Sequence, residues 1–171
     1  MYETVPVTTL TEKQRRNFSC GVNALDDYFR QFAKGNHTKN IGKTFALLED
    51  NSVVGYYTTS MGSVDFHALP EEFRARLPRY PIPIARIARL AVDVKYQGMG
   101  FGEFLLVDAL HRIREATFLV AAYGVVVDAK DEKAKSFYKR FGFKTFYDNN
   151  LCMFLPINSI FGKDSPLEVR P

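Results

Sequence analysis

Gln97-Gly98-Met99-Gly100-Phe101-Gly102 carries glycines at three alternating positions. Apolar residues dominate the segment before it, 84–94, and an amphipathic segment, 103–114, follows it. This order predicts a strand, a tight loop and a helix. Glycine has no Cβ and adopts positive φ, so the N–H groups of such a loop can converge on an anion at the positive end of the helix. The loop therefore predicts a pyrophosphate site, although a purely structural turn would also explain the glycines.

The spacing of the glycines narrows the kind of site. A dinucleotide-binding fingerprint reads G-x-G-x-x-G, and a Walker A loop ends in Gly-Lys-Ser/Thr. The sequence matches neither, because its glycines read G-x-G-x-G and neither Lys nor a hydroxyl residue follows Gly102. It fills the pattern Gln/Arg-x-x-Gly-x-Gly/Ala with Gln97, Gly100 and Gly102. In this it resembles the coenzyme A loop of the GCN5-related N-acetyltransferase (GNAT) family.

Two flanking segments strengthen the resemblance. Arg89-Leu90-Ala91-Val92-Asp93 is similar to the central strand of that family, and residues 134–143, AKSFYKRFGF, are similar to its helix with an F-Y-x-x-x-G-F ending. The resemblance implies an α/β (α+β) GNAT fold: a mixed, mostly antiparallel central sheet flanked by helices, with a splayed central strand. It also implies acetyl-CoA as the acetyl donor and a set of cofactor-binding residues. These are Leu90, Ala91, Val92, Gln97, Gly98, Met99, Gly100, Phe101 and Gly102.

Working outward from the loop, hydrophobic periodicity predicts alternating strands and helices. Asp50-Asn51 reads as the turn of a hairpin, and Asn23 and Gly35 read as the cap and the end of a helix. Strands are expected over residues 2–10, 44–49, 53–61, 84–94, 124–127, 143–147 and 151–155. Helices are expected over residues 23–34, 70–76, 103–115 and 132–141.

Length and composition favour one domain. A chain of 171 residues with 46% apolar residues can bury a sizeable core. We expect a single N-acetyltransferase domain over residues 1–160 and a flexible tail over 161–171. An apolar run of about 18 residues is absent, as is a charged-then-apolar leader, which predicts a cytoplasmic protein without a membrane span.

Cysteine and histidine usage argues against metal chemistry. Cys20 and Cys152 are isolated and form no C-x-x-C pair. His37, His67 and His111 lie far apart in the sequence and outside the motifs. We therefore expect no bound metal, and we expect packing or surface roles for these residues.

A longer set of short motifs is similar to the toxin branch of the GNAT family and spans roughly residues 10–155. The motifs are Phe18-Ser19-Cys20-Gly21, Leu25-Asp26-Asp27-Tyr28, Thr44-Phe45, Val54-Gly55-Tyr56-Tyr57 and Pro83-Ile84. This resemblance implies a type II toxin that acetylates the free amine of aminoacyl-tRNA. It further implies a ribbon-helix-helix antitoxin as partner, and a homodimer.

The chemistry implied is direct attack of an amine on the acetyl thioester. The tetrahedral oxyanion needs fixed donors, which backbone N–H groups near Leu90 to Val92 can supply, and the departing thiolate needs a proton. The family places the tyrosine of its F-Y-x-x-x-G-F segment beside the coenzyme sulfur, which makes Tyr138 the expected proton donor. The simpler alternative is that Tyr138 only packs. An α-amine titrates near neutral pH, so a dedicated strong base is unnecessary.

Charge bears on the acceptor. The formal net charge of +4 favours a polyanionic partner. Arg79, Arg86 and Arg89 are the candidate contacts to tRNA phosphates, although each could be an ordinary solvated residue. Two alternatives stay open. One is a peptide, polyamine or small-amine N-acetyltransferase, and the other is a catalytically degenerate module that binds coenzyme A or a partner.

Overall fold

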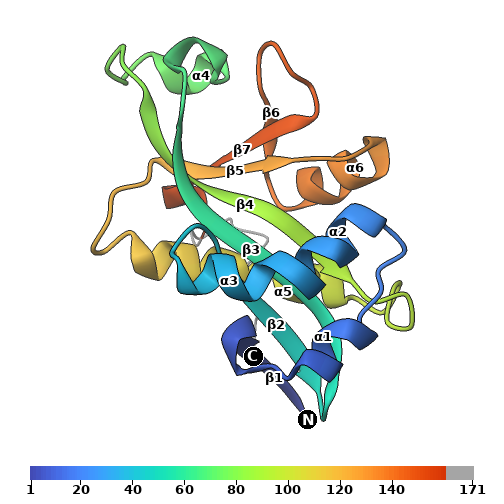
Figure 1. Ribbon diagram of the computed structural model, residues 1–171. Coiled ribbons are helices and arrows are strands. Elements are labelled where there is room, and N and C mark those ends of the chain that lie inside the picture. Colours follow the sequence, from blue (N-terminus) through green and yellow to red (C-terminus); the bar gives the residue numbers. More distant parts are fainter. Residues whose placement is uncertain (161–171) are drawn as a thin grey trace. The chain divides into compact units, whose positions relative to one another are not determined.

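The computed structural model describes residues 1–160 of the chain (Figure 1). These residues form two compact units, and the chain passes between them more than once. Unit 1 comprises Met1–Ser60 and Ala88–Ala109, and unit 2 comprises Met61–Ile87 and the residues from Leu110 onward. The predictions for residues 161–171 lie outside the described residues.

The strands confirm the predicted fold class. They follow the order β1-β2-β3-β4-β5-β7-β6. The pair β4–β5 is parallel, whereas the pairs β1–β2, β2–β3, β5–β7 and β6–β7 are antiparallel. With helices α1 to α6 along the chain, this is the mixed, mostly antiparallel α/β arrangement expected.

Unit 1 begins with an antiparallel meander. Strand β1 (Tyr2–Pro6) pairs with β2 (Lys43–Glu49), and β2 pairs with β3 (Ser52–Val64). Asp50 adopts a positive φ of 51° in the tight connection from β2 to β3. The hairpin predicted at Asp50-Asn51 is therefore confirmed, and β3 extends beyond the predicted end.

The elements of unit 1 differ from the prediction at three places. Helix α1 (Glu12–Asn17) was not predicted, although Thr11 and Gln14 form a capping box at its start. Strand β1 ends at Pro6, where a 3₁₀ turn (Val7–Thr9) replaces the predicted strand. The helix predicted over 23–34 is a longer composite of α2 (Asn23–Asp27), a π turn (Tyr28–Phe32) and α3 (Ala33–Thr38).

The cap and the end predicted for the helix over 23–34 are both wrong. Val22 occupies the cap position and Asn23 is the first helical residue. Gly35 lies inside α3, where a Cβ would meet nothing within 4 Å. The helix continues through Gly35 because packing of its apolar face outweighs the cost of one internal glycine.

The core of unit 1 lies where these helices cover β2 and β3 (Figure 1). The rings of Phe18, Phe29 and Tyr56 meet with centroid separations of 4.9, 5.4 and 4.5 Å. The Tyr56 hydroxyl donates to the carbonyl of Leu25 at 2.7 Å, so the buried polar end of this ring is satisfied. The helix is thus fixed on the sheet by contacts among these three rings and by a hydrogen bond.

Unit 2 is built around β5 (Gly124–Asp128). One side of β5 pairs in parallel with residues Ile84–Ile87 of β4 (Ile82–Val92), and the other side pairs with β7 (Cys152–Pro156). The short strand β6 (Lys144–Thr145) pairs with β7. Helix α4 (Glu71–Arg74) is shorter than predicted, and 3₁₀ turns cover Phe66–Ala68 and Ile157–Ser159.

Helices α5 (Phe101–Ala116) and α6 (Glu132–Arg140) match the prediction closely. Asp131 caps α6 by accepting a hydrogen bond from the Ala134 N–H, and Gly142 follows the helix with φ of +89°. Among residues 1–160, the structure contains no helix with both the length and the apolar character needed to cross a bilayer.

Candidate active site

The glycine loop lies in unit 1, between the end of β4 at Val92 and the start of α5 at Phe101. Gly98 and Gly100 have φ of +78° and +86°, and a Cβ at either position would meet nothing within 4 Å. The space around them is open, so the backbone conformation rather than crowding requires glycine. The predicted strand, loop and helix are therefore confirmed.

Helix α5 opens directly from this loop. The Phe104 N–H donates to the Gly100 carbonyl, the first bond of the helical pattern. Phe101 and Gly102 precede that bond, so their N–H groups have no partner within the helix. Phe101 is held by its ring, which lies 5.1 Å from the Tyr2 ring and 5.8 Å from the Tyr96 ring. The loop thus presents backbone donors at a rigid helix start, as an anion site requires.

Gln97 is exposed, but its side chain is tied to the backbone by hydrogen bonds. Its amide nitrogen donates to the carbonyl of Cys20 and to the carbonyl of Val92, each at 2.9 Å. Met99 is also exposed. Among the residues predicted to contact the cofactor, Gln97 and Met99 are therefore both exposed, and the Gln97 side chain is held by hydrogen bonds to the backbone.

The end of β4 carries the predicted oxyanion donors. Ala91 is buried, and Leu90 and Val92 are half-buried. The pairing of β4 with β5 covers Ile84–Ile87 and does not include residues 88–92. Gly55 of β3 allows close approach here, because a Cβ would lie 2.6 Å from the Ala91 carbonyl oxygen.

Asp93 closes the strand. It is 4% exposed, and its carboxylate accepts from the N–H of Ser19 at 2.9 Å and from the N–H of Lys95 at 3.0 Å. Asp93 therefore links the loop to the Phe18-Ser19-Cys20-Gly21 segment. The sequence shows this segment as a motif but does not show which residues it contacts.

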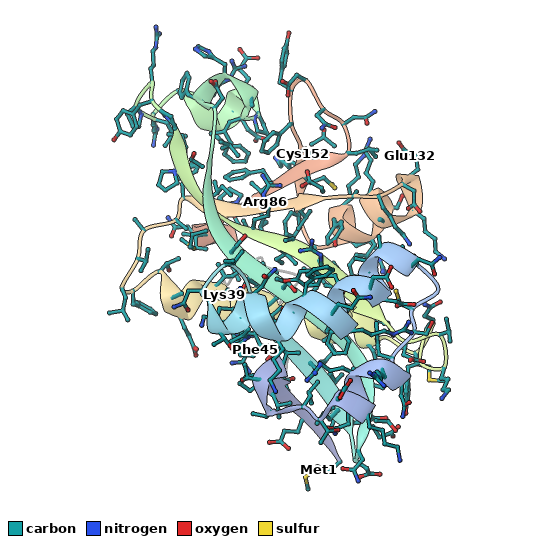
Figure 2. The ribbon with its side chains drawn as sticks, in the orientation of Figure 1. Met1, Lys39, Phe45, Arg86, Glu132 and Cys152 are labelled. Carbon is teal, nitrogen blue, oxygen red and sulfur yellow. The ribbon has the colours of Figure 1, made fainter. Side chains whose placement is uncertain are left out.

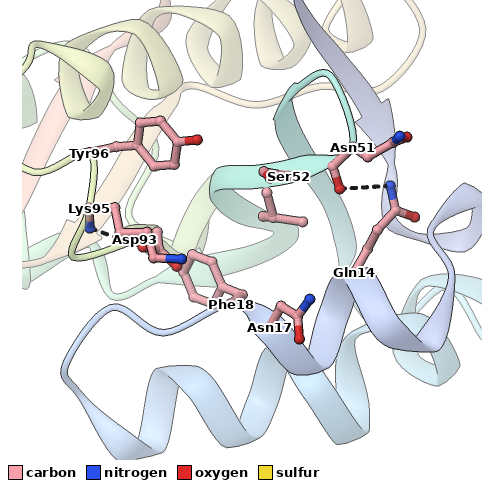
Figure 3. Close-up of a pocket in the computed structure, with 9 residues that line it drawn as sticks. Gln14, Asn17, Phe18, Asn51, Ser52, Asp93, Lys95 and Tyr96 are labelled. Atoms are coloured by element: carbon pink, nitrogen blue, oxygen red, sulfur yellow. Dashed lines mark hydrogen bonds between the residues drawn. The ribbon is translucent and has the colours of Figure 1, made fainter.

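A polar cavity of about 250 Å³ adjoins the first residues of the loop (Figure 3). Its wall includes Lys95 and Tyr96 of the loop, and Figure 3 shows the hydrogen bond from the Gln14 amide to the Asn51 carbonyl on the opposite side. The cavity is lined by Gln14, Asn17, Phe18, Asn51, Ser52, Val53, Asp93, Lys95 and Tyr96. The sequence gives no sign of this cavity, because its residues come from three separate segments.

Tyr138 lies on α6 in unit 2. It is 8% exposed, and its ring contacts those of Phe137 and Phe143 at centroid separations of 5.1 and 5.5 Å. Burial, with a smaller contribution from the charge of Asp128, raises the pKa of Tyr138 to about 12. The phenol therefore keeps its proton at neutral pH and can donate it.

Asp128 organises the same unit. The Arg86 guanidinium contacts its carboxylate at 2.5 Å, and Cys152 is its partner in the β5–β7 register; Figure 2 labels Arg86 and Cys152 on their strands. Burial, followed by the charge of Asp128, raises the pKa of Cys152 to about 12. In unit 1, burial likewise raises the pKa of Cys20 to about 11. Both thiols are therefore protonated at neutral pH and unsuited to act as nucleophiles.

The three candidate tRNA-contacting arginines have different surroundings. Arg79 is exposed in unit 2, and Arg86 of that unit is paired with Asp128. In unit 1, the Arg89 guanidinium stacks 3.5 Å from the ring centroid of Tyr28. Arg79 is therefore the candidate whose charge is most open to a partner.

Histidine, cysteine and carboxylate groups do not gather into a metal site among residues 1–160, where no cluster of three or more such side chains occurs.

The acetyltransferase (GNAT) domain family matches residues 40–145, more than half of the chain. The chain belongs to the GNAT family. This confirms the prediction of an acyltransferase that uses acetyl-CoA.

Two curated relatives narrow the resemblance within the GNAT family. The chain is 38% identical to a tRNA-acetylating toxin of Mycobacterium tuberculosis over 75% of this chain and 76% of the relative. It is 31% identical to a probable toxin TacT of Sinorhizobium fredii over 85% of this chain and 86% of the relative.

Solved GNAT toxins share the fold over nearly the whole chain. AtaT complexed with acetyl-methionyl-tRNA aligns with a TM-score of 0.85 at 28% identity, covering 94% of this chain and 97% of that one. An AtaT mutant bound to the C-terminus of the antitoxin AtaR and to acetyl-CoA aligns with a TM-score of 0.75 at 28% identity, covering 93% and 95%.

Proposed function

We propose that this protein transfers the acetyl group of acetyl-CoA to the α-amine of an aminoacyl-tRNA, and that it acts as a toxin that blocks translation. The observation that carries the proposal is the 38% identity to a tRNA-acetylating toxin over three quarters of both chains. The similarity to AtaT in complex with acetyl-methionyl-tRNA supports the same acceptor.

The partners proposed follow from the same relatives. AtaT binds the C-terminus of its antitoxin AtaR, and a KacTA–DNA complex is also similar to this chain. We therefore propose a ribbon-helix-helix antitoxin as the neutralising partner, residues 1–160 as one catalytic domain, and a homodimer. Because charged tRNA is used in the cytoplasm, we propose a cytoplasmic location.

In the proposed mechanism, the glycine loop binds the pyrophosphate of acetyl-CoA through the N–H groups of Gly98 to Gly102. Backbone N–H groups of residues 90–92 receive the oxygen of the tetrahedral intermediate. The amine nitrogen forms a bond to the acetyl carbon as the carbon–sulfur bond breaks, and the sulfur leaves with the electron pair of that bond. The amine loses one proton and the sulfur gains one, so the transfer balances.

Tyr138 is the proposed proton donor to the sulfur. Its raised pKa keeps the phenol protonated until negative charge develops on the leaving thiolate. The proton released by the attacking amine returns to solvent, from which the phenolate recovers its own. Solved structures include mutants of KacT and AtaT in which a tyrosine is replaced by phenylalanine, and this supports a tyrosine in the role of proton donor.

Transfer of labelled acetyl from acetyl-CoA to total charged tRNA tests the proposal, with uncharged tRNA and a panel of free amines as controls. We expect label on charged tRNA alone. Label on peptides, polyamines or small amines instead would keep the chemistry and reject the toxin assignment. Binding of acetyl-CoA without transfer to any acceptor would indicate a degenerate binding module.

A further inference from the structure

Gln97 belongs to the loop pattern that predicts the coenzyme A site, yet its amide nitrogen already donates to two backbone carbonyls. An amide side chain has two N–H donors and one carbonyl acceptor. Both recorded hydrogen bonds of the Gln97 nitrogen go to backbone carbonyls, those of Cys20 and Val92, at 2.9 Å each. A phosphate would have to displace one of them, and the remaining amide oxygen would repel it.

The two carbonyls belong to segments far apart in the sequence. Val92 ends β4, and Cys20 lies 77 residues before Gln97. Backbone contacts join the same two segments, because the Val94 N–H donates to the Ser19 carbonyl and the Ser19 N–H donates to Asp93, both at 2.9 Å. Gln97 thus completes a cross-link between the Phe18–Gly21 segment and the strand that leads into the loop.

The Phe18–Gly21 segment is itself held firmly. The buried Asp26 carboxylate accepts from the Cys20 N–H at 2.8 Å and from the Ser19 hydroxyl at 3.0 Å. The Arg30 guanidinium donates to the Phe18 carbonyl at 2.5 and 3.2 Å. Because Asp26 and Arg30 lie on the helix that begins at Asn23, the segment provides a fixed anchor for the amide of Gln97.

We propose that Gln97 is a positioning residue that shapes the coenzyme A loop before the cofactor binds, and that it makes no contact with the pyrophosphate. By holding Cys20 to Val92, its amide fixes both the end of β4, where the oxyanion donors lie, and the departure of the chain toward Gly98 and Gly100. The consequences for catalysis rest on the proposed function, whereas the cross-link itself can be tested without it.

Three variants separate the amide from the bulk of the side chain. Gln97→Met keeps the length and removes the donors. Gln97→Arg restores a planar group with several N–H donors. Gln31→Met makes the same chemical change at an exposed glutamine of the same unit and serves as the matched control.

Hydrogen exchange of the ligand-free protein gives the first readout. We expect Gln97→Met to speed exchange roughly tenfold in peptides covering residues 18–22 and 93–102, about the combined effect of losing two hydrogen bonds of modest net strength. Peptides from β5 and α6 report whether the fold persists, and Gln31→Met is expected to match the wild type. Unchanged exchange at both segments in Gln97→Met would overturn the cross-link whether or not the protein acetylates tRNA.

Kinetics with two acetyl donors give the second readout. Acetyl-pantetheine lacks the pyrophosphate, so a side chain that binds phosphate cannot affect its use. We expect Gln97→Met to lower kcat with acetyl-CoA and kcat/KM with acetyl-pantetheine, each roughly tenfold, because the donors on β4 are misplaced. Gln97→Arg is expected to recover most of both. A rise in KM for acetyl-CoA alone, with acetyl-pantetheine unaffected, would make Gln97 a phosphate ligand and reject the proposal.

Discussion

The phenol of Tyr138 lies in an aromatic cluster, and burial raises its pKa from the ordinary 10.0 to about 12. Burial of a hydroxyl is costly unless it is hydrogen-bonded. Tyr138 can be singled out from a local sequence motif on its helix. The role of Asp26 depends on hydrogen bonds to residues that it meets only in the folded chain.

Replacing Tyr138 with Phe removes the donor and keeps the ring contacts. We expect acetyl transfer to fall by about 10²–10⁴-fold, the usual contribution of an acid catalyst, while the affinity for acetyl-CoA is retained. Steady-state transfer and calorimetric titration with acetyl-CoA measure the two effects. Tyr147→Phe, at a tyrosine that is 78% exposed, is the matched control. Full activity in Tyr138→Phe would remove Tyr138 from the mechanism.

Asp26 stabilises the fold in its charged form. Burial acts to raise the pKa of this carboxyl, but hydrogen bonds from Cys20 and Ser19 and the charge of Arg30 outweigh it, so the pKa lies below the ordinary 3.8. The unfolded chain therefore takes up the proton first as pH falls. Stability from Asp26 is complete above pH 3.8 and is lost below it, as the pH approaches the folded-state pKa.

We expect Asp26→Asn to lower the free energy of unfolding at pH 7 by about 1–3 kcal/mol. Each carboxylate oxygen of Asp26 accepts one hydrogen bond, whereas the asparagine amide has only one oxygen to accept them. Urea unfolding at pH 7 and near pH 3 measures it, and the difference between variant and wild type should shrink at the lower pH. Asp27→Asn, at the exposed neighbour, should be nearly neutral. Equal stability of Asp26→Asn and wild type at pH 7 would contradict this account.

At the scale of elements, the register of β3 against its neighbours in unit 1 depends on one missing side chain. A Cβ on Gly55 would lie 2.6 Å from both the Ala91 carbonyl oxygen and a methyl carbon of Leu105. Real Cβ atoms do not approach backbone this closely, so β3, the end of β4 and α5 can pack as they do only with glycine at this position.

Gly55→Ala should therefore force these elements apart. We expect a loss of about 1–3 kcal/mol in the free energy of unfolding, typical of overpacking, together with reduced acetyl transfer because the donors at the end of β4 shift. Denaturant melts and transfer assays measure both. Gly35→Ala, inside α3 with open space around it, should instead stabilise the protein by about 0.5–1 kcal/mol. A neutral Gly55→Ala would show that the strands can yield.

Sequence periodicity located most elements but misjudged those whose limits depend on packing. The helix predicted to stop before Gly35 continues to Thr38, and β1 stops at Pro6 although apolar residues continue to Leu10. Val7 and Leu10 are buried in the same core without being in a strand. Local patterns report burial, and burial alone does not specify the backbone conformation.

At the scale of the whole molecule, the formal charge of +4 suits a polyanionic acceptor. The arginines differ in availability, since Arg86 pairs with Asp128 and Arg89 stacks on Tyr28, whereas Arg79 is exposed. A basic side chain without an internal partner gains most from a phosphate contact.

Arg79→Glu should accordingly raise the KM for charged tRNA by roughly tenfold at low salt, with a smaller effect at higher salt because the contact is screened. The KM for acetyl-CoA, which Arg79 is not proposed to contact, is the internal control and should not change. An equal rise in the KM for acetyl-CoA, or no rise in the KM for charged tRNA, would place the phosphate contact elsewhere.

Residues close together in the chain are enough to predict the glycine loop, the strand and helix beside it and the GNAT family, and a similar local motif makes Tyr138 the proposed proton donor. Only the tertiary structure decided which carbonyls the Gln97 amide joins, why position 55 is glycine and how Asp26 is buried. The physical reason is that these contacts join segments separated by tens of residues, and such contacts depend on three-dimensional packing rather than on local propensity.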